Sequence, residues 1–363
     1  MRDMVEWKKL GEVCQVLDSQ RKPVSKGNRS QGEYPYYGAN GIQDYVDGYI
    51  FDGTYLLLGE DGSVINTDNS PVLHWATGKI WVNNHAHILQ ENNKALLRYL
   101  YYTLQCTDVS DIVRGMPPKI NQANMRNILI PIPSLEEQTR IVRILDTFTS
   151  AIDNLKEQIA QRRKQYEYYR DQLLDLEGKE GVEMKTLGNV GEICMCKRIM
   201  KDQTSDKGEI PFFKIGTFGG QADAYITRNL FEEYKNKFSY PKKGEILISA
   251  AGTIGRSVIF DGVDAYFQDS NIVWIANDEM LVTNRYLYYF YQIADWKTDG
   301  GTIKRLYNYN LKNTEIKVPP LEEQSRIVSI LDTFEASIAN LEAQLKEREK
   351  LYEYYRNKLL TFE

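Results

Sequence analysis

The chain has 363 residues and a net charge of −5, a length that exceeds one compact core of ordinary size and suits two domains with connecting elements. No apolar run approaches the length that a bilayer requires, and the opening MRDMVEWKKL lacks the pattern of a secretory signal peptide. The four cysteines do not occur at matching places in the two halves, which argues against a disulfide framework. We therefore expect an unexported, cytoplasmic protein and exclude a membrane-spanning one.

The acidity of the chain is concentrated in two segments. Residues 134–180 and 319–363 carry −2 and −3, whereas residues 1–133 and 181–318 are close to neutral at −1 and +1. Phosphate binding depends on Lys and Arg, so a negative net charge ordinarily argues against a nucleic-acid partner. Because the longer segments are nearly neutral, the net charge does not exclude DNA; it requires any basic surface to be local.

Residues 1–133 predict a first domain with a mostly β core. Short β-forming runs at 54–58 and 79–82 are separated by Gly and Asn, and residues 95–105 are typical of a helix. The Glu-Asp-Gly sequence at 60–62 indicates a turn directly after the first run.

Two histidines of this domain, His85 and His87, would share one face of a strand. Two ligands do not make a metal site. Core or hydrogen-bonding roles are therefore favoured over metal binding, and contact with DNA is a third possibility.

Two polar groups in the first domain are candidates for DNA contact. Bases are read by Arg, Lys, Asn and Gln through paired hydrogen bonds, while Lys and Arg hold the phosphates. The first group joins basic residues to a tyrosine-rich run, and the second leads into the next helix; the candidates are Arg21, Lys22, Lys26, Arg29, Tyr36, Tyr37, Asn40, Arg114 and Lys119. Each can equally be solvated surface, and the two tyrosines can equally be core.

Residues 134–178 predict a long helix. Pro133 precedes it, Ser134 and Glu137 have the spacing of a capping box, and Gly178 follows its end. Its seam positions step by four and three residues without a slip for more than four heptads, the pattern of a coiled coil. At about 1.5 Å per residue, roughly 40 residues span about 60 Å. The seam includes Ile141, Leu145, Phe148, Ile152, Leu155 and Arg162.

Residues 179–318 predict a second α+β domain that begins and ends like the first. VEWK and LG near the start of the chain recur as VEMK and LG, and Gly115 and Asn124 recur 186 positions later as Gly301 and Asn310. The shared ends of the two domains indicate a common framework.

The middle of the second domain has its own sequence. It predicts a strand at 245–249 and a helix at 284–292. The candidates for DNA contact in this domain are Lys197, Arg198, Lys201, Lys214, Arg256, Lys304 and Arg305.

Residues 319–363 repeat the first helix: of the 42 residues from 133 to 174, 26 recur unchanged 186 positions later. Two such helices can pair antiparallel with pseudo-twofold symmetry and hold the domains at opposite ends, or each seam can pack against another subunit. Arg162 and Arg348 share one heptad place, where they either extend to solvent or fix the register of the pair. The second seam includes Ile327, Leu331, Phe334, Ile338, Leu341 and Arg348.

Signs of catalysis in the sequence are weak. EWK at 6–8 and EMK at 183–185 have the Glu-x-Lys form of metal-dependent nucleases, but no Pro-Asp lies at a suitable distance before them, which favours strands at the start of each domain. CMC at 194–196 lacks a second pair of zinc ligands. The sequence contains no methyltransferase tetrapeptide, phosphate loop or dinucleotide fingerprint. We expect no catalytic residue, metal or cofactor in this chain.

The layout resembles the DNA-specificity subunit of type I restriction-modification systems, in which two variable domains alternate with two conserved helices. The resemblance is carried by IPIPSLEEQTRIVRILD and VPPLEEQSRIVSILD at the helix starts, by WKKLGEV and MKTLGNV at the domain starts, and by YPYYGANGIQDYV with LLLGEDGSV inside the first domain. It covers essentially the whole chain, and the double occurrence of Leu-Glu-Glu-Gln-x-Arg-Ile-Val makes it specific.

The resemblance implies a non-catalytic subunit that binds double-stranded DNA, docks two methyltransferase subunits and, through them, recruits restriction subunits. Each domain would read one half of a bipartite site, and the helices would set the spacer between the halves. S-adenosylmethionine, ATP and Mg would belong to the partner subunits.

Two other hypotheses stay open. A coiled-coil scaffold that binds protein without DNA specificity would also contain repeated helices, although divergence confined to the domain middles speaks against it. A self-contained nuclease would depend on Glu6 and Glu183.

Overall fold

The computed structural model describes residues 5–299 and 304–362. Gly301, which takes part in the sequence repeat, lies outside the described residues. Within the described part of the chain, no helix is both long and apolar enough to span a membrane.

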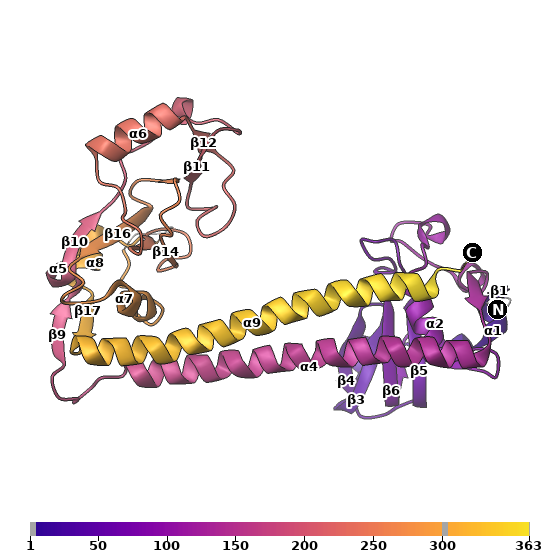
Figure 1. Ribbon diagram of the computed structural model, residues 1–363. Helices are drawn as coiled ribbons and strands as arrows, with labels where there is room; N and C mark the ends of the chain where they lie inside the picture. The colour runs from indigo at the N-terminus through magenta and orange to yellow at the C-terminus, as the bar shows by residue number, and fades with distance from the viewer. Residues whose placement is uncertain (1–4, 300–303, 363) are drawn as a thin grey trace. The chain divides into compact units, whose positions relative to one another are not determined.

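The chain forms two compact units. Unit 1 comprises residues 1–157 and 342–363, and unit 2 comprises residues 158–341. Each unit contains one globular domain and one segment of each of the two long helices (Figure 1).

The domain of unit 1 is built on a six-stranded sheet. Its elements are β1 (Glu6–Lys9), α1 (Leu10–Val13), β2 (Cys14–Val16), β3 (Gln31–Gly38), β4 (Gly41–Val46), β5 (Phe51–Gly59), β6 (Leu73–Val82), β7 (Ala86–Glu91), α2 (Leu97–Leu104), α3 (Gln122–Arg126) and β8 (Leu129–Ile132). The strand order is β2-β7-β5-β6-β3-β4, and all neighbours are antiparallel except β3 and β6. β1 and β8 form a separate antiparallel pair. The strands expected at 54–58 and 79–82 lie in β5 and β6, and the expected helix is α2.

The central strand β5 is buried on both faces. Leu56 and Leu58 join the apolar cluster that contains α2, whereas Leu57 points to a second cluster with Ile80 and Ile88. Side chains alternate between the two faces of a strand, so a run of leucines supplies both clusters. The apolar run in the sequence is therefore a fully covered strand.

Unit 2 contains a four-stranded sheet of order β10-β16-β13-β14, a three-stranded sheet of order β12-β11-β15 and the antiparallel pair of β9 and β17. The strands expected at 183–185 and 245–249 are confirmed, as is the helix expected at 284–292. The elements are β9 (Glu183–Thr186), α5 (Leu187–Val190), β10 (Gly191–Cys194), β11 (Ile210–Phe213), β12 (Tyr225–Ile226), α6 (Arg228–Lys237), β13 (Ile246–Ser249), β14 (Ser257–Ile259), β15 (Tyr266–Phe267), β16 (Ile272–Asn277), α7 (Asn284–Tyr291), α8 (Asn308–Asn313) and β17 (Glu315–Val318).

The long helices, α4 (Leu135–Leu174) and α9 (Leu321–Leu360), run antiparallel. In unit 1 the ring of Phe148 stacks on Tyr355 with 5.4 Å between ring centroids, and in unit 2 Phe334 stacks on Tyr169 at 5.3 Å. The beginning of each helix therefore packs against the end of the other. The two ring pairs are related by the 186-residue offset of the sequence repeat, so the two helices pair in the same way within each unit.

The predicted seam forms the packed side of each long helix. Arg162 is half-buried, with its guanidinium carbon 5.7 Å from the centre of the Phe334 ring, whereas Arg348 is exposed. Arg348 thus extends to solvent and does not act as a buried register residue. The remaining seam residues are buried or half-buried: Ile141, Leu145, Phe148, Ile152, Leu155, Ile327, Leu331, Phe334, Ile338 and Leu341.

A buried glutamine joins each domain to its long helix. Gln138 and Gln324 are fully buried, and their side-chain oxygens accept hydrogen bonds of 2.9 Å from the backbone N–H groups of Leu96 and Thr283. Each amide group donates to the carbonyl of the proline five positions earlier, at 3.0 and 2.9 Å. These are the glutamines of the repeated Leu-Glu-Glu-Gln sequence, so both copies of that sequence make the same connection.

An arginine makes a second connection of the same kind. Arg98 donates from Nε to Asp146 at 2.7 Å, and Arg285 donates to Asp332 at 2.7 Å. The tyrosine four residues after each arginine donates its hydroxyl to the same carboxylate, and burial raises the pKa of both tyrosines. We use the term frame for the repeated parts: β1, β8, α2 and the beginning of α4 in unit 1, and β9, β17, α7 and the beginning of α9 in unit 2.

Candidate nucleic-acid interface

Three loops of unit 1 meet at one place. They are residues 60–63 after β5, residues 83–85 before β7 and residues 114–119 before α3. Glu60 N–H donates to His85 O at 2.8 Å, and Gly62 N–H donates to Pro118 O at 2.9 Å. Backbone hydrogen bonds therefore fix the three loops to one another.

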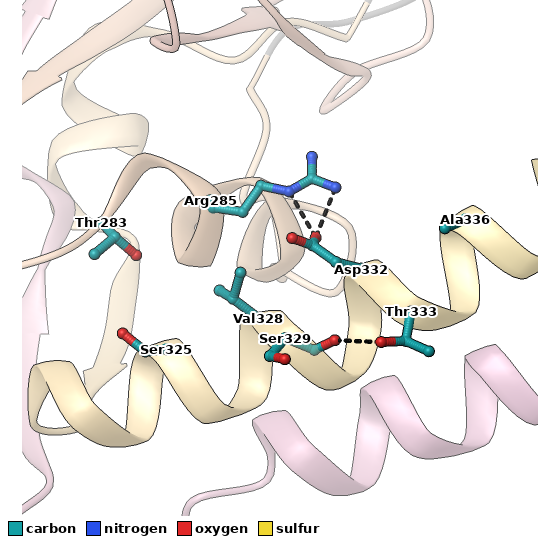
Figure 2. Close-up of a pocket in the computed structure, with 8 residues that line it drawn as sticks. All are labelled: Thr283, Arg285, Ser325, Val328, Ser329, Asp332, Thr333 and Ala336. Atoms are coloured by element: carbon teal, nitrogen blue, oxygen red, sulfur yellow. Dashed lines mark hydrogen bonds and ion pairs between the residues drawn. The ribbon is translucent and has the colours of Figure 1, made fainter.

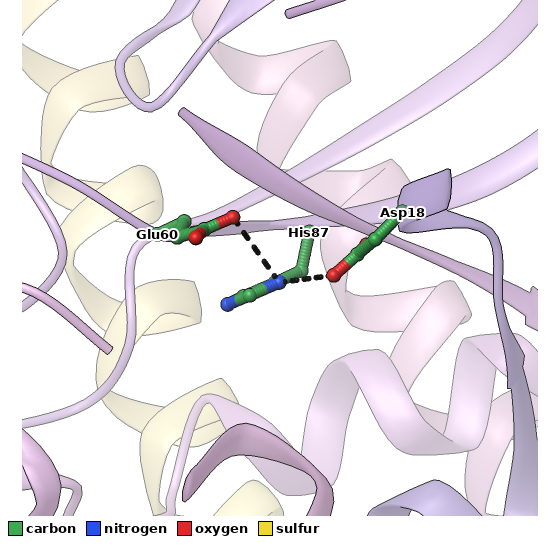
Figure 3. A group of neighbouring side chains, drawn as sticks. All are labelled: Asp18, Glu60 and His87. Atoms are coloured by element: carbon green, nitrogen blue, oxygen red, sulfur yellow. Dashed lines mark hydrogen bonds and ion pairs between the residues drawn. The ribbon is translucent and has the colours of Figure 1, made fainter. Parts of the chain in front are cut away.

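A buried group of charged side chains lies beneath these loops. His87 is fully buried, with Nδ1 2.6 Å from Asp18 Oδ2 and 3.5 Å from Glu60 Oε2. Figure 3 shows the two carboxylates on either side of the imidazole ring. Nε2 lies 2.8 Å from the carbonyl oxygen of Ile120, which can only accept, so this nitrogen carries a proton.

Asp18 is the acceptor at the centre of this group. Burial by itself would raise the pKa of Asp18, but interactions with His87 and hydrogen bonds from Ile88 N–H and the Gln122 side chain hold it below the ordinary value of 3.8. Asp18 therefore faces Nδ1 of His87 as an ionised acceptor, and both ring nitrogens of His87 are hydrogen-bonded. Arg21 and Lys119 add two cations, each ion-paired with Glu60. We call Asp18, Arg21, Glu60, His87 and Lys119 the ion cluster.

The ion cluster has the donor atoms of a metal site but not its chemistry. The candidate ligand atoms of Asp18, Glu60 and His87 lie within 4.8 Å of one another. Both imidazole nitrogens are already hydrogen-bonded, and two cationic side chains contact Glu60, so the carboxylates are neutralised by protein groups. The arrangement is that of a structural clamp. Glu60, expected only as a turn residue, is part of this clamp.

Three sequence candidates in unit 1 serve the interior of the domain. Arg21 belongs to the ion cluster. Arg29 lies 4.1 Å from the centre of the Tyr36 ring, donates to Val24 O at 3.0 Å and pairs with Asp44 at 3.3 Å. Tyr36 is 1% exposed. These side chains hold the segment before β3 in place and are not available at the surface.

Other candidates of unit 1 lie at or near the surface. Tyr37 is half-buried, and Lys119, although paired with Glu60, keeps 46% of its side chain exposed. Four further candidates are exposed: Lys22, Lys26, Asn40 and Arg114.

Unit 2 joins equivalent segments. Leu306 N–H donates to Ala250 O at 2.9 Å, as Ile120 N–H does to Glu60 O in unit 1. Arg305 donates to Ser270 O at 2.7 Å and connects the segment before α8 with the loop before β16. The candidate DNA-binding surface is therefore formed in both domains by equivalent loops: the loops after β5, before β7 and before α3 in unit 1, and those after β13, before β16 and before α8 in unit 2.

The basic candidates of unit 2 are again divided between surface and structure. Arg256 donates to Phe218 O at 2.9 Å, Lys214 pairs with Asp223, and Arg198 pairs with Asp269. Lys197, Lys201 and Lys304 are exposed, and Arg305 is half-buried.

The ion cluster of unit 1 has apolar counterparts in unit 2. Strand register places Gly191 at the position of Cys14, so Met195 corresponds to Asp18. The 186-residue offset places Val273 at the position of His87, and the shared backbone bond places Ala250 at that of Glu60. All three counterparts pack in the apolar cluster of the domain.

Matching pockets occur on the long helices. Figure 2 shows the pocket in unit 2, where Arg285 reaches across to Asp332 from the neighbouring helix. Its lining residues are Thr283, Arg285, Ser325, Val328, Ser329, Asp332, Thr333 and Ala336. The pocket of unit 1 is lined at the positions 186 residues earlier by Thr139, Val142, Arg143, Asp146, Thr147 and Ser150.

Known proteins with the same organisation span the whole chain. The model for the type I restriction modification DNA specificity domain matches residues 4–162 and 179–349. A Haemophilus influenzae protein named as a type I restriction enzyme specificity subunit is 51% identical over 372 aligned positions, covering 99% of this chain and 96% of its own. The EcoR124I/EcoR124II specificity subunit of Escherichia coli is 30% identical, covering 99% and 94%.

A solved structure shares the fold. The S subunit of the type I restriction-modification system from M. genitalium superposes with a TM-score of 0.66 at 14% identity, covering 99% of this chain and 97% of its own. The family model matches twice, each match extends into one of the repeated helices, and the alignments cover nearly the whole of both relatives. The chain belongs to the DNA specificity subunits of type I restriction-modification systems.

Proposed function

We propose that this subunit recognises a bipartite DNA site, with each domain reading one half. One contrast supports this proposal: the frame is the same in both domains, whereas the side chains beneath the loops differ between them. Gln138 and Gln324 make the same connection, whereas the group beneath the loops is ionic in one domain and apolar in the other. A pseudo-twofold frame that carries two different surfaces suits a target made of two different halves.

We further propose that the long helices set the distance between the half-sites. α4 and α9 are each continuous, and each contributes to both units. Seven residues added to each helix at the pseudo-twofold centre would preserve the heptad seam and lengthen the pair by about 10 Å. The spacer in the methylated motif should then lengthen, and an unchanged spacer would contradict this role.

The matched pockets support docking of two copies of one partner, which we propose to be methyltransferase subunits. Small and polar residues line both pockets, and an Arg–Asp pair borders the one in unit 2. Restriction subunits would join through the methyltransferases. S-adenosylmethionine, ATP and Mg would be bound by those partners, so this subunit would contribute recognition without catalysis, in the cytoplasm where the DNA target lies.

The test is methylome sequencing of a host that expresses this chain with its cognate methyltransferase. A new bipartite motif is expected. Replacing residues 14–114 by the same segment of a relative should change one half of that motif, and a matched replacement in unit 2 should change the other. A motif that changes in both halves after one replacement would contradict the modular assignment.

A further inference from the structure

The loop at 114–119 carries a fully exposed apolar side chain at its tip. Met116 is 99% exposed and is followed by two exposed prolines, Pro117 and Pro118. Proline rings fix φ and restrict the residue before them, so this tip has few conformations. Gly115 has φ +85°, a value that glycine adopts without strain, and it turns the chain into the tip.

The base of this tip is held firmly. Arg114 and Lys119 pair across the loop by backbone hydrogen bonds of 2.9 and 2.8 Å. Pro118 O accepts from Gly62 N–H at 2.9 Å, and the Lys119 ammonium lies 3.3 Å from Glu60 of the ion cluster. The loop is therefore an anchored projection whose apolar end points to solvent.

The surroundings of Met116 fit DNA better than a protein surface. Arg114 and Lys119 flank the tip and are both exposed, and because Lys119 is ion-paired with Glu60, the positive charge beside the apolar group comes from Arg114. Proteins that bend DNA combine phosphate contacts from Arg and Lys with an apolar wedge, often Met or Pro, that enters a base step. A protein partner would instead be expected to meet a wider apolar patch.

We propose that Met116 is a wedge that inserts into a base step at the half-site read by unit 1, while Arg114 holds a neighbouring phosphate and Lys119 anchors the loop to Glu60. This inference rests on the proposed DNA recognition and adds a mode of contact to it. Insertion unstacks one step and kinks the duplex, so part of the specificity would come from how easily that step deforms.

The experiment uses the complete complex of this subunit with its methyltransferase and duplexes that carry 2-aminopurine at successive positions of the site. Apart from the methylated adenines, which a methyltransferase flips out of the stack, the wild-type complex should raise the fluorescence at one step, since unstacking relieves quenching. Met116→Ala should abolish that rise and weaken specific binding by about tenfold, whereas Met116→Leu should retain it. Met280→Ala is the matched control, because Met280 is 78% exposed in unit 2 and has no role in the wedge.

Three outcomes separate the wedge from the proposed function. Specific binding without a fluorescence rise at any position other than the methylated adenines would overturn the wedge and leave DNA recognition intact. Loss of methyltransferase binding in Met116→Ala, measured by size-exclusion chromatography, would make the loop a protein contact and also overturn the wedge. Absence of specific binding by the wild-type complex would overturn the proposed function itself. Arg114→Gln should lower affinity for all sequences and reduce the salt slope by about one.

Discussion

The loops of unit 1 rest on buried charges, whereas the equivalent loops of unit 2 rest on apolar side chains. Asp18, Glu60 and His87 are matched by Met195, Ala250 and Val273, although the strands beneath them pair in the same register. Replacing a buried ionic network by packed apolar groups is often neutral or stabilising. The cluster is therefore not needed for the fold as such.

The ion cluster differs from its counterpart in what it connects. It links the segment after β2, the end of β5, β7 and the loop at 114–119, and each link is directional. Apolar contacts fill space without fixing the angle at which a loop leaves the domain. Both units fix these loops with backbone hydrogen bonds, and we infer that unit 1 adds the ion cluster and unit 2 adds Arg305 to set their direction.

The largest expected effect comes from breaking the cluster at one member. Asp18→Ala should destabilise unit 1 by about 3–5 kcal/mol, because His87, Ile88 N–H and the Gln122 side chain would lose their shared acceptor and Arg21 and Glu60 would be left in an incomplete buried network. Met195→Ala is the matched change in unit 2 and should cost no more than about 2 kcal/mol, because Met195 is only partly buried. Urea unfolding followed by hydrogen exchange of peptides from each unit measures both. Equal costs would mean that the two supports are energetically alike.

Low pH should destabilise unit 1 more than unit 2, by less than the Asp18→Ala substitution does. The pKa of Asp18 is depressed in the folded state, so its stabilisation is complete above the unfolded value of 3.8 and is lost as the pH falls through the folded pKa. Met195 contributes no such loss. Hydrogen exchange between about pH 5 and pH 3 should show the loops of unit 1 opening first. Loops of unit 2 that open earlier would contradict this order.

The shared frame predicts equal effects in the two units. Gln138→Ala and Gln324→Ala should each cost about 1–3 kcal/mol, since each leaves a buried backbone N–H without its acceptor. The two costs should agree within about 0.5 kcal/mol. Chemical denaturation with unit-resolved exchange gives the comparison. If the two substitutions changed the free energy of unfolding by clearly different amounts, the repeated sequence would not contribute equally to the stability of the two units.

The smallest effect on stability should come from replacing three residues of the ion cluster by their apolar counterparts from unit 2. Asp18→Met, Glu60→Ala and His87→Val together should change the stability of unit 1 by less than about 1 kcal/mol. The half-site read by unit 1 should nevertheless be methylated less selectively, since the loops lose their fixed direction. A cost as large as that of Asp18→Ala alone would argue that the cluster is required for folding.

The frame could be predicted from the sequence, and the ion cluster could not. Heptad spacing and the 186-residue repeat can be read along the sequence, so they located the long helices and the residues of their seams. Asp18, Glu60 and His87 are far apart along the chain and meet only through the sheet. Arg21 and Tyr36 were candidates for DNA contact because a basic or aromatic residue looks the same in sequence whether it faces solvent or a buried partner.

The glutamine connection has a consequence for how this subunit can evolve. Within the described residues, the side chain of Gln138 bonds to backbone groups alone, namely Leu96 N–H and the carbonyls of Lys94 and Pro133, and Gln324 bonds to the equivalent set. Backbone groups are the same whatever side chains a domain carries. The glutamine connection therefore does not depend on which side chains a domain carries, so a foreign domain that keeps the arginine bonded to Asp146 or Asp332 can be joined there without a change at the glutamine.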